Sequence, residues 1–238
     1  MIDRARLKKS AKDTLQHRKA SAYLVGAVYV GFAGLSDTLI YALTGYDVLI
    51  SRLQNALSVS PELGLEDALA MAEPIGPVAL AFIAAFVLYR IAARFCLKGF
   101  CLGLARGVNP GLSGFLDGLS LFFKSILLFF LKLVLVLLGL IFFIAPGVYL
   151  WYGFRQDEYV LLVNPRLSAI ACLRQSHRLM RGRRRELFRL DLSFLGWRFV
   201  GLLVYYQFSM WLLSVWLAPY SGITYAGFYL ELCAISGP

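Results

Sequence analysis

Long apolar runs alternate with short polar segments along the chain, and they predict helices that cross a membrane. The long runs cover residues 21–43, 75–101, 119–144 and 192–217, and each reaches the roughly 20 residues that a helix needs to cross a bilayer. A shorter run over residues 223–235 predicts a re-entrant or surface helix. This pattern excludes a soluble domain and predicts an all-α, polytopic helical membrane bundle that forms one integral-membrane domain over residues 1–238.

The third run predicts a helical hairpin. It breaks at Ala145-Pro146-Gly147 and continues as an apolar arm to Val163. Lys and Arg mark the cytoplasmic side: residues 1–19 carry seven of them, residues 44–73 one, residues 89–118 four and residues 164–190 eight. A hinge at Pro146 and Gly147 returns the chain to the cytoplasmic side before the last segment. We therefore expect about five to six membrane segments and a cytoplasmic N-terminus.

Four consecutive polar residues interrupt the returning arm and are the candidate site: Arg155, Gln156, Asp157 and Glu158. Ionisable groups at membrane depth must pair with one another or reach water. Candidate charge partners are Lys124 and Lys132 in the third run and Asp37 in the first. Two interpretations stay open, a polar cavity that binds or conducts a ligand, and internal ion pairs that hold the arm in the bundle. For Asp37, a place near the interface and a pair inside the bundle stay open too.

Two basic amphipathic segments predict helices at the membrane interface. Residues 1–19 place Leu7, Ala11 and Leu15 on one helical face, with Asp3 as the N-cap. Residues 164–190 predict a cytoplasmic interfacial helix that starts at Asn164-Pro165. Its polar face carries a stripe of four arginines that would contact anionic headgroups or an acidic partner: Arg174, Arg178, Arg181 and Arg185.

Composition and charge narrow the chemistry. Of the 238 residues, 59% are hydrophobic and 16% charged, against ~45–50% and ~25% in soluble domains. The net charge is +10, and it lies in loops between apolar runs, which favours anionic headgroups over nucleic acid as the partner. The four cysteines lack metal-ligand spacing. We expect free thiols and neither a metal nor another cofactor.

The segment from Ser176 to Trp197, with Pro219-Tyr220 and Phe228-Tyr229 downstream, resembles a bacterial integral-membrane family known as domain of unknown function nine-seven-five. The Leu-Lys-Lys-Ser-Ala-Lys start and the Pro146-Gly147 break are similar to it too, so the resemblance covers nearly the whole chain. It implies a multi-span protein of the bacterial cytoplasmic membrane. It implies no established activity and no catalytic residues.

Three functions remain open from the sequence. The favoured one is a non-enzymatic component of an envelope or transport system that binds lipid or a membrane-protein partner. The first alternative is a small-solute or lipid transporter that works as a homo-oligomer, because broken helices recur at transport sites. The second is an intramembrane enzyme with Asp157 or Glu158 as its acid or base. The sequence contains no nucleophile elbow, phosphate loop or metal motif to support the last.

Overall fold

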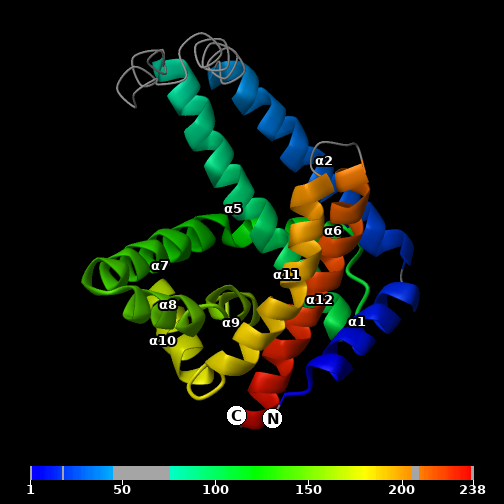
Figure 1. Cartoon of the computed structure of the whole chain (residues 1–238), viewed down its shortest axis with the longest axis vertical. Coiled ribbons are helices and arrows are strands. Elements are labelled where there is room, and N and C mark those ends of the chain that lie inside the picture. The colour runs from blue at the N-terminus through cyan, green and yellow to red at the C-terminus, as the bar shows by residue number, and fades with distance from the viewer. Residues whose placement is uncertain (1, 18, 45–75, 205–208, 237–238) are drawn as a thin grey trace. The chain divides into compact units, whose positions relative to one another are not determined.

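The computed structural model describes residues 2–17, 19–44, 76–204 and 209–236, and the regular elements in these ranges are all helices (Figure 1). Residues 44–73, the segment with a single Lys or Arg between the first two apolar runs, lie almost wholly outside these ranges. The helices are α1 (Arg4–His17), α2 (Lys19–Thr44), α5 (Pro77–Ala105), α6 (Gly111–Leu116), the 3-10 helix η1 (Asp117–Leu121), α7 (Phe122–Phe142), α8 (Ile144–Gly153), α9 (Asp157–Val163), α10 (Ala169–Leu179), α11 (Arg184–Val204) and α12 (Ser209–Ser236).

Three described stretches are long and apolar enough to cross a membrane. They are Ser21–Ile40 in α2, Leu80–Ala105 in α5 and Ser113–Phe142, which ends with α7. They match the first three apolar runs of the sequence and mark a multi-pass membrane protein. The all-helical class and the three spans confirm the coarse prediction of a membrane bundle.

The chain divides into two compact units. The smaller one, Gly31–Arg90, contains the second half of α2 and the first half of α5. Within it, Asp37 Oδ1 lies 2.6 Å from Arg90 Nη1, and both side chains are half-exposed. Asp37 is therefore an ion-paired residue of this unit. The larger unit, Met1–Val30 with Ile91–Pro238, contains the candidate site.

Helices α7 and α8 form the predicted hairpin, but the break lies at a different residue. Phe143 is extended, with φ −163° and ψ 153°, and separates the two helices. The predicted hinge residues Pro146 and Gly147 instead lie in the first turn of α8, where a proline fits a helix. Gly147 allows the close approach of the two helices, because a methyl group there would lie 2.9 Å from the backbone nitrogen of Leu140.

The tip of this hairpin is apolar and open. Ile141, Phe142, Phe143 and Ile144 are 75–77% exposed. Exposure of four adjacent large apolar side chains to water is energetically unfavourable. This tip is therefore suited to a hydrocarbon environment.

The last third of the chain differs from the predicted span over residues 192–217. Helix α11 ends at Val204, and α12 begins at Ser209 and continues through Pro219 to Ser236. The predicted end of this segment at residue 217, directly before Ala218-Pro219, is thus wrong. Gly26 of α2 packs closely at this point, since a methyl group there would lie 2.5 Å from the Val215 carbonyl oxygen. Packing against a neighbouring helix lets the helix continue past its proline.

Helix α1 buries its apolar stripe against the protein. Leu7, Ala11 and Leu15 are at most 6% exposed, and Leu7 packs with Phe228 and Leu232 of α12. Asp3 Oδ1 accepts a hydrogen bond from the Ala5 backbone N–H at 2.9 Å, which confirms the predicted N-cap. The apolar stripe of α1 thus packs on the protein itself, largely on α12, and its basic residues face outward.

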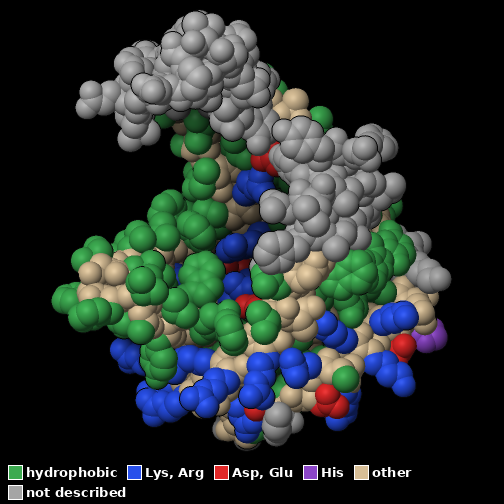
Figure 2. All heavy atoms as spheres, viewed as in Figure 1, with side chains coloured by type: hydrophobic (Ala, Val, Ile, Leu, Met, Phe, Trp, Pro, Cys, Tyr) green, Lys and Arg blue, Asp and Glu red, His purple; other side chains and the backbone are tan. Residues whose placement is uncertain are grey.

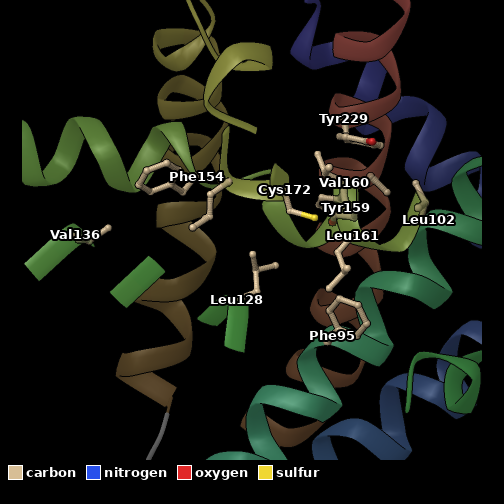
Figure 3. Close-up of a cluster of buried hydrophobic side chains, with 12 residues drawn as sticks. Phe95, Leu102, Leu128, Val136, Phe154, Tyr159, Val160, Leu161, Cys172 and Tyr229 are labelled. Atoms are coloured by element: carbon tan, nitrogen blue, oxygen red, sulfur yellow. The ribbon is translucent and has the colours of Figure 1, made fainter. Parts of the chain in front are cut away.

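The short helix α9 forms the centre of the larger unit. Its residues Asp157 to Leu161 are all buried. Figure 3 shows Tyr159, Val160 and Leu161 of this helix near Phe95 of α5 and Tyr229 of α12, and the rings of Tyr159 and Tyr229 stack at 5.4 Å. Two carboxylates therefore enter the core on the same helix as its apolar residues.

Candidate functional site: a buried charge network

The four polar residues predicted as the site do not lie in one helix. Helix α8 ends at Gly153, and α9 begins at Asp157. Ser176 of α10 holds the turn between them: its hydroxyl donates to the Gly153 carbonyl at 2.9 Å and accepts from the Gln156 N–H at 3.1 Å. The single returning arm of the prediction is thus two helices, and the turn directs consecutive side chains toward different neighbours.

Asp157 and Glu158 pair with lysines from two helices. Lys132 Nζ of α7 lies 2.9 Å from Asp157 Oδ2 and 3.3 Å from Glu158 Oε1. Lys98 Nζ of α5 lies 2.8 Å from Glu158 Oε2. The two carboxylates thereby tie α9 to α7 and α5. Lys132 was a predicted partner, whereas Lys98 was not.

Arg94 completes this cluster. Its Nη2 donates to Glu158 Oε1 at 3.1 Å, and its guanidinium lies 5.9 Å from the ring centre of Phe129. Arg90, Arg94 and Lys98 follow one another at intervals of four residues along α5. The spacing places Arg94 and Lys98 on the same helical face, and that signal could have identified a joint partner.

The burial of this cluster sets its energetic role. The Asp157 side chain is fully buried, the Glu158 side chain is 6% exposed and the Lys132 side chain 9% exposed. Several kcal/mol is the order of the cost of burying an unpaired ion, so the carboxylates depend on their cations. The ion pairs hold α9 in place, and the fold therefore depends on them.

Arg155 points to another neighbour. Its Nη2 lies 3.7 Å from Asp191 Oδ1 of α11, and the Tyr225 hydroxyl of α12 donates to the same oxygen at 2.6 Å. Asp191 and Ser176 were not predicted, because neither has a sequence neighbour that hints at its partner. The polar residues at the start of α9 thus connect it to α5, α7, α10 and α11.

The other two candidate partners lie elsewhere. Lys124 is exposed and donates to the Pro165 carbonyl at 2.7 Å, and no ion pair joins it to α9 among the described residues. Asp37 pairs with Arg90 in the smaller unit. Of the three predicted partners, the structure brings only Lys132 to the four polar residues.

The predicted interfacial helix over residues 164–190 is two helices. Helix α10 starts at Ala169 with Ser168 as its N-cap, whose side chain accepts from the Ala171 N–H, so the predicted start at Asn164-Pro165 is wrong. Gly182, with φ 77°, lies in the turn that separates α10 from α11. The arginine stripe is exposed but divided: two members lie on α10, one in the turn and one on α11, namely Arg174, Arg178, Arg181 and Arg185.

His177 of α10 packs on the hairpin helix α8. Its ring lies 6.1 Å from that of Tyr149 and 5.7 Å from that of Phe154, and Arg184 Nη2 is 3.2 Å from its Nε2. Burial and the positive charges of Arg184 and Arg181 lower the pKa of His177. His177 is therefore a partly buried residue that packs at the contact between α8 and α10.

The cysteines are free thiols, as predicted. Cys96, Cys101 and Cys172 are buried and Cys233 is partly buried. Cys101 packs closely on α12, where a methyl group at Gly222 would lie 2.5 Å from its sulfur. These residues act as small apolar side chains in the core.

Comparison with known proteins gives a family without an activity. No curated protein and no solved structure matches the chain. One family model matches, over residues 75–236, and its description is "Protein of unknown function (DUF975)". This range includes the buried charge network and the arginine stripe. The match covers more than half of the chain, and the protein therefore belongs to the DUF975 family.

Proposed function

We propose that this protein binds the anionic headgroups of the bacterial cytoplasmic membrane through one basic face, as a non-enzymatic component of an envelope or transport system. The observation that supports the proposal is the meeting of two basic segments that lie far apart in the sequence. Arg4 Nη1 of α1 donates to the Arg189 carbonyl at 3.2 Å, and Lys8 Nζ donates to the Ser193 carbonyl at 3.3 Å. Helix α1 and the start of α11 thus present their charges together.

The exposed charges extend this face. Figure 2 shows Lys and Arg side chains gathered over α1, α10 and the start of α11. Near an anionic surface each such charge contributes about 1 kcal/mol of attraction. The positive side of a membrane protein is its cytoplasmic side, so the proposal places the N-terminus and the arginine stripe in the cytoplasm.

The test measures lipid enrichment around the reconstituted protein. The protein is placed in nanodiscs of phosphatidylcholine with a minority of fluorescent phosphatidylglycerol, and energy transfer from its tryptophans reports the lipid beside it. We expect a variant with Arg174, Arg178, Arg181 and Arg185 all changed to Gln to lose most of the enrichment. The matched variant with four Lys keeps the charge and should keep the enrichment. Equal enrichment in the Gln variant contradicts the proposal.

The accessory role has a separate test. The protein is extracted in native lipid without detergent exchange, and mass spectrometry identifies what accompanies it. A protein in fixed stoichiometry supports an accessory subunit and names its system. Enriched anionic lipid without a protein partner supports lipid binding alone.

A second candidate is a transporter that works as an oligomer. The helix break at Phe143 and the buried ions at the start of α9 favour it, because discontinuous helices line transport sites. The test compares the flux of solutes into vesicles for wild type and for Asp157→Asn with Glu158→Gln. A folded variant that has lost the flux supports transport, and a loss of folding supports structural pairing.

A further inference from the structure

A cavity of about 330 Å³ lies beside the charge network, within the larger unit. Residues of α2, α5, α9 with the turn before it, and α12 line it. Its size falls within the range of pockets that bind small molecules. In Figure 2, Lys and Arg side chains are visible in the recess between the hydrophobic surface of α7 and the helices α11 and α12.

The cavity is positively charged. Arg94, Lys98 and Arg155 line it, and no Asp or Glu is among the described residues that do. The network as a whole holds four cations, Arg94, Lys98, Lys132 and Arg155, against three carboxylates, Asp157, Glu158 and Asp191. One positive charge is left over, so the cavity favours a ligand with a negative charge.

The cavity also contains unsatisfied hydrogen-bonding atoms. Gln156 lines it and is 1% exposed, and its Oε1 has no partner among the described residues. The Nε of Arg94 is likewise buried without a partner. Buried polar atoms are nearly always hydrogen-bonded. A ligand that accepts from Arg94 and donates to Gln156 would satisfy both.

The walls set the remaining properties of the ligand. Leu97, Tyr159 and Ala218 supply apolar surface beside the cations. An anionic oxygen group with a hydroxyl donor nearby fits this combination, and the arginines favour phosphate, which they bind with several oxygens at once.

We propose that this cavity binds a phosphate ester that carries a neighbouring hydroxyl group, as in the headgroup of a glycerol-phosphate lipid. For the lipid source, this inference rests on the proposed lipid-binding function. A soluble glycerol phosphate has the same chemistry and is the other source. In either case the phosphate lies among Arg94, Lys98 and Arg155, and the hydroxyl donates to Gln156.

The test on wild-type protein compares probes that differ only in the hydroxyl groups of a three-carbon headgroup. The protein in phosphatidylcholine nanodiscs is titrated with phosphatidylglycerol or with phosphatidylpropanol, which has the same number of headgroup carbons but no headgroup hydroxyl. Native mass spectrometry counts the lipid retained after partial delipidation. Soluble sn-glycerol 3-phosphate and propyl phosphate form the second pair. We expect the member with hydroxyl groups to bind about tenfold more tightly, because Gln156 Oε1 stays without a hydrogen-bond donor when the other member binds.

Variants locate the binding in the cavity. Ser221 lines the cavity, and Ser221→Leu fills it while leaving every charge in place. We expect this variant to lose the retained lipid at least tenfold, and Gln156→Leu to abolish the difference between the paired probes. Ser113→Leu makes the same change on the exposed face of α6 and should bind as wild type does.

The outcomes separate this inference from the proposed function. Binding of the lipid pair alone assigns the site to a membrane lipid, and binding of the soluble pair alone assigns it to a free phosphate ester. The proposed site is refuted if neither pair of probes binds. It is also refuted if a folded Ser221→Leu protein binds them as tightly as wild type does. Neutralising the arginine stripe should lower the bulk lipid enrichment and leave the retained molecule in place, so that each claim fails separately.

Discussion

Removal of the Lys132 charge is the sharpest test of the buried network. Asp157 is fully buried, and Lys132 is the cation within ion-pair distance of it among the described residues. Glu158 is different, because it keeps Lys98 and Arg94 when Lys132 is lost. The change Lys132→Met retains most of the side-chain volume and leaves Asp157 as a buried charge without its partner.

The expected loss of stability is large. Breaking a buried ion pair by removing one member costs about 3–5 kcal/mol of stability. The Glu158 backbone N–H donates a hydrogen bond to Asp157 at 2.8 Å. Because this bond still stabilises the carboxylate, we expect a loss near the lower end of that range. The double variant Lys132→Met with Asp157→Asn removes both charges, and it should recover most of the loss. Lys124→Met is the control: this exposed lysine donates one hydrogen bond to a carbonyl, so about 0.5–1.5 kcal/mol is expected.

The assay is reversible unfolding in mixed micelles of rising SDS fraction, followed by the far-ultraviolet circular dichroism. The double-mutant cycle gives the coupling between Lys132 and Asp157. The reasoning is refuted if Lys132→Met loses less than about 1 kcal/mol. It is equally refuted if the double variant is no more stable than the single one.

Three further changes test other contacts of the fold. Gly147→Ala should lower stability by about 1–3 kcal/mol, because the new methyl group overlaps α7. Gly196→Ala is the control: its methyl group meets no atom within 4 Å, and it should be neutral or stabilising. Thermal unfolding compares the two variants. Ser176→Ala leaves the turn before α9 with two unpaired backbone groups and should cost about 1–3 kcal/mol in the same measurement; a neutral effect would show that the hydroxyl does not hold the turn. The lowered pKa of His177 means that the unfolded chain takes up this proton first as pH falls below about 6.5. Stability should therefore decrease from there until the folded form is protonated as well, and His177→Gln should have a flatter profile of unfolding midpoint against pH; an unchanged profile would assign the pH dependence to other groups.

The apolar pattern predicted where most helices lie, because a membrane-spanning run is a strong local signal. It failed at Pro219, which α12 includes without ending. It also failed at residues 154–156, which separate α8, ending at Gly153, from α9. Both outcomes depend on partners distant in sequence, namely Gly26 and Ser176, which a local pattern does not contain.

The candidate site was predictable in part for the same reason. Four polar residues in an apolar arm are conspicuous, and they do form the centre of the network. Their partners were harder to identify, because every Lys or Arg near an apolar run is a candidate. Lys132 was predicted only together with Lys124, because both interrupt the same apolar run. Asp191 lies in a polar stretch where an acidic residue needs no special explanation. The cavity beside them is lined by four regions that lie far apart in the sequence, and no local pattern predicts it.

The packing of α1 on α12 has a consequence for biosynthesis. The two helices come from opposite ends of the described chain, so α1 emerges from the ribosome long before the surface that covers Leu7, Ala11 and Leu15 exists. Neighbouring helices such as α7 and α8 can pair as soon as both are made, whereas this contact closes the longest loop of the fold and forms late.

Until then α1 is a basic helix with an uncovered apolar stripe, and the nearest apolar phase is the membrane surface. The nascent chain would thus hold α1 on the membrane surface and transfer it to α12 once α12 has been made. The amphipathic pattern of α1 would then serve two surfaces in succession, the lipid during synthesis and α12 in the finished protein.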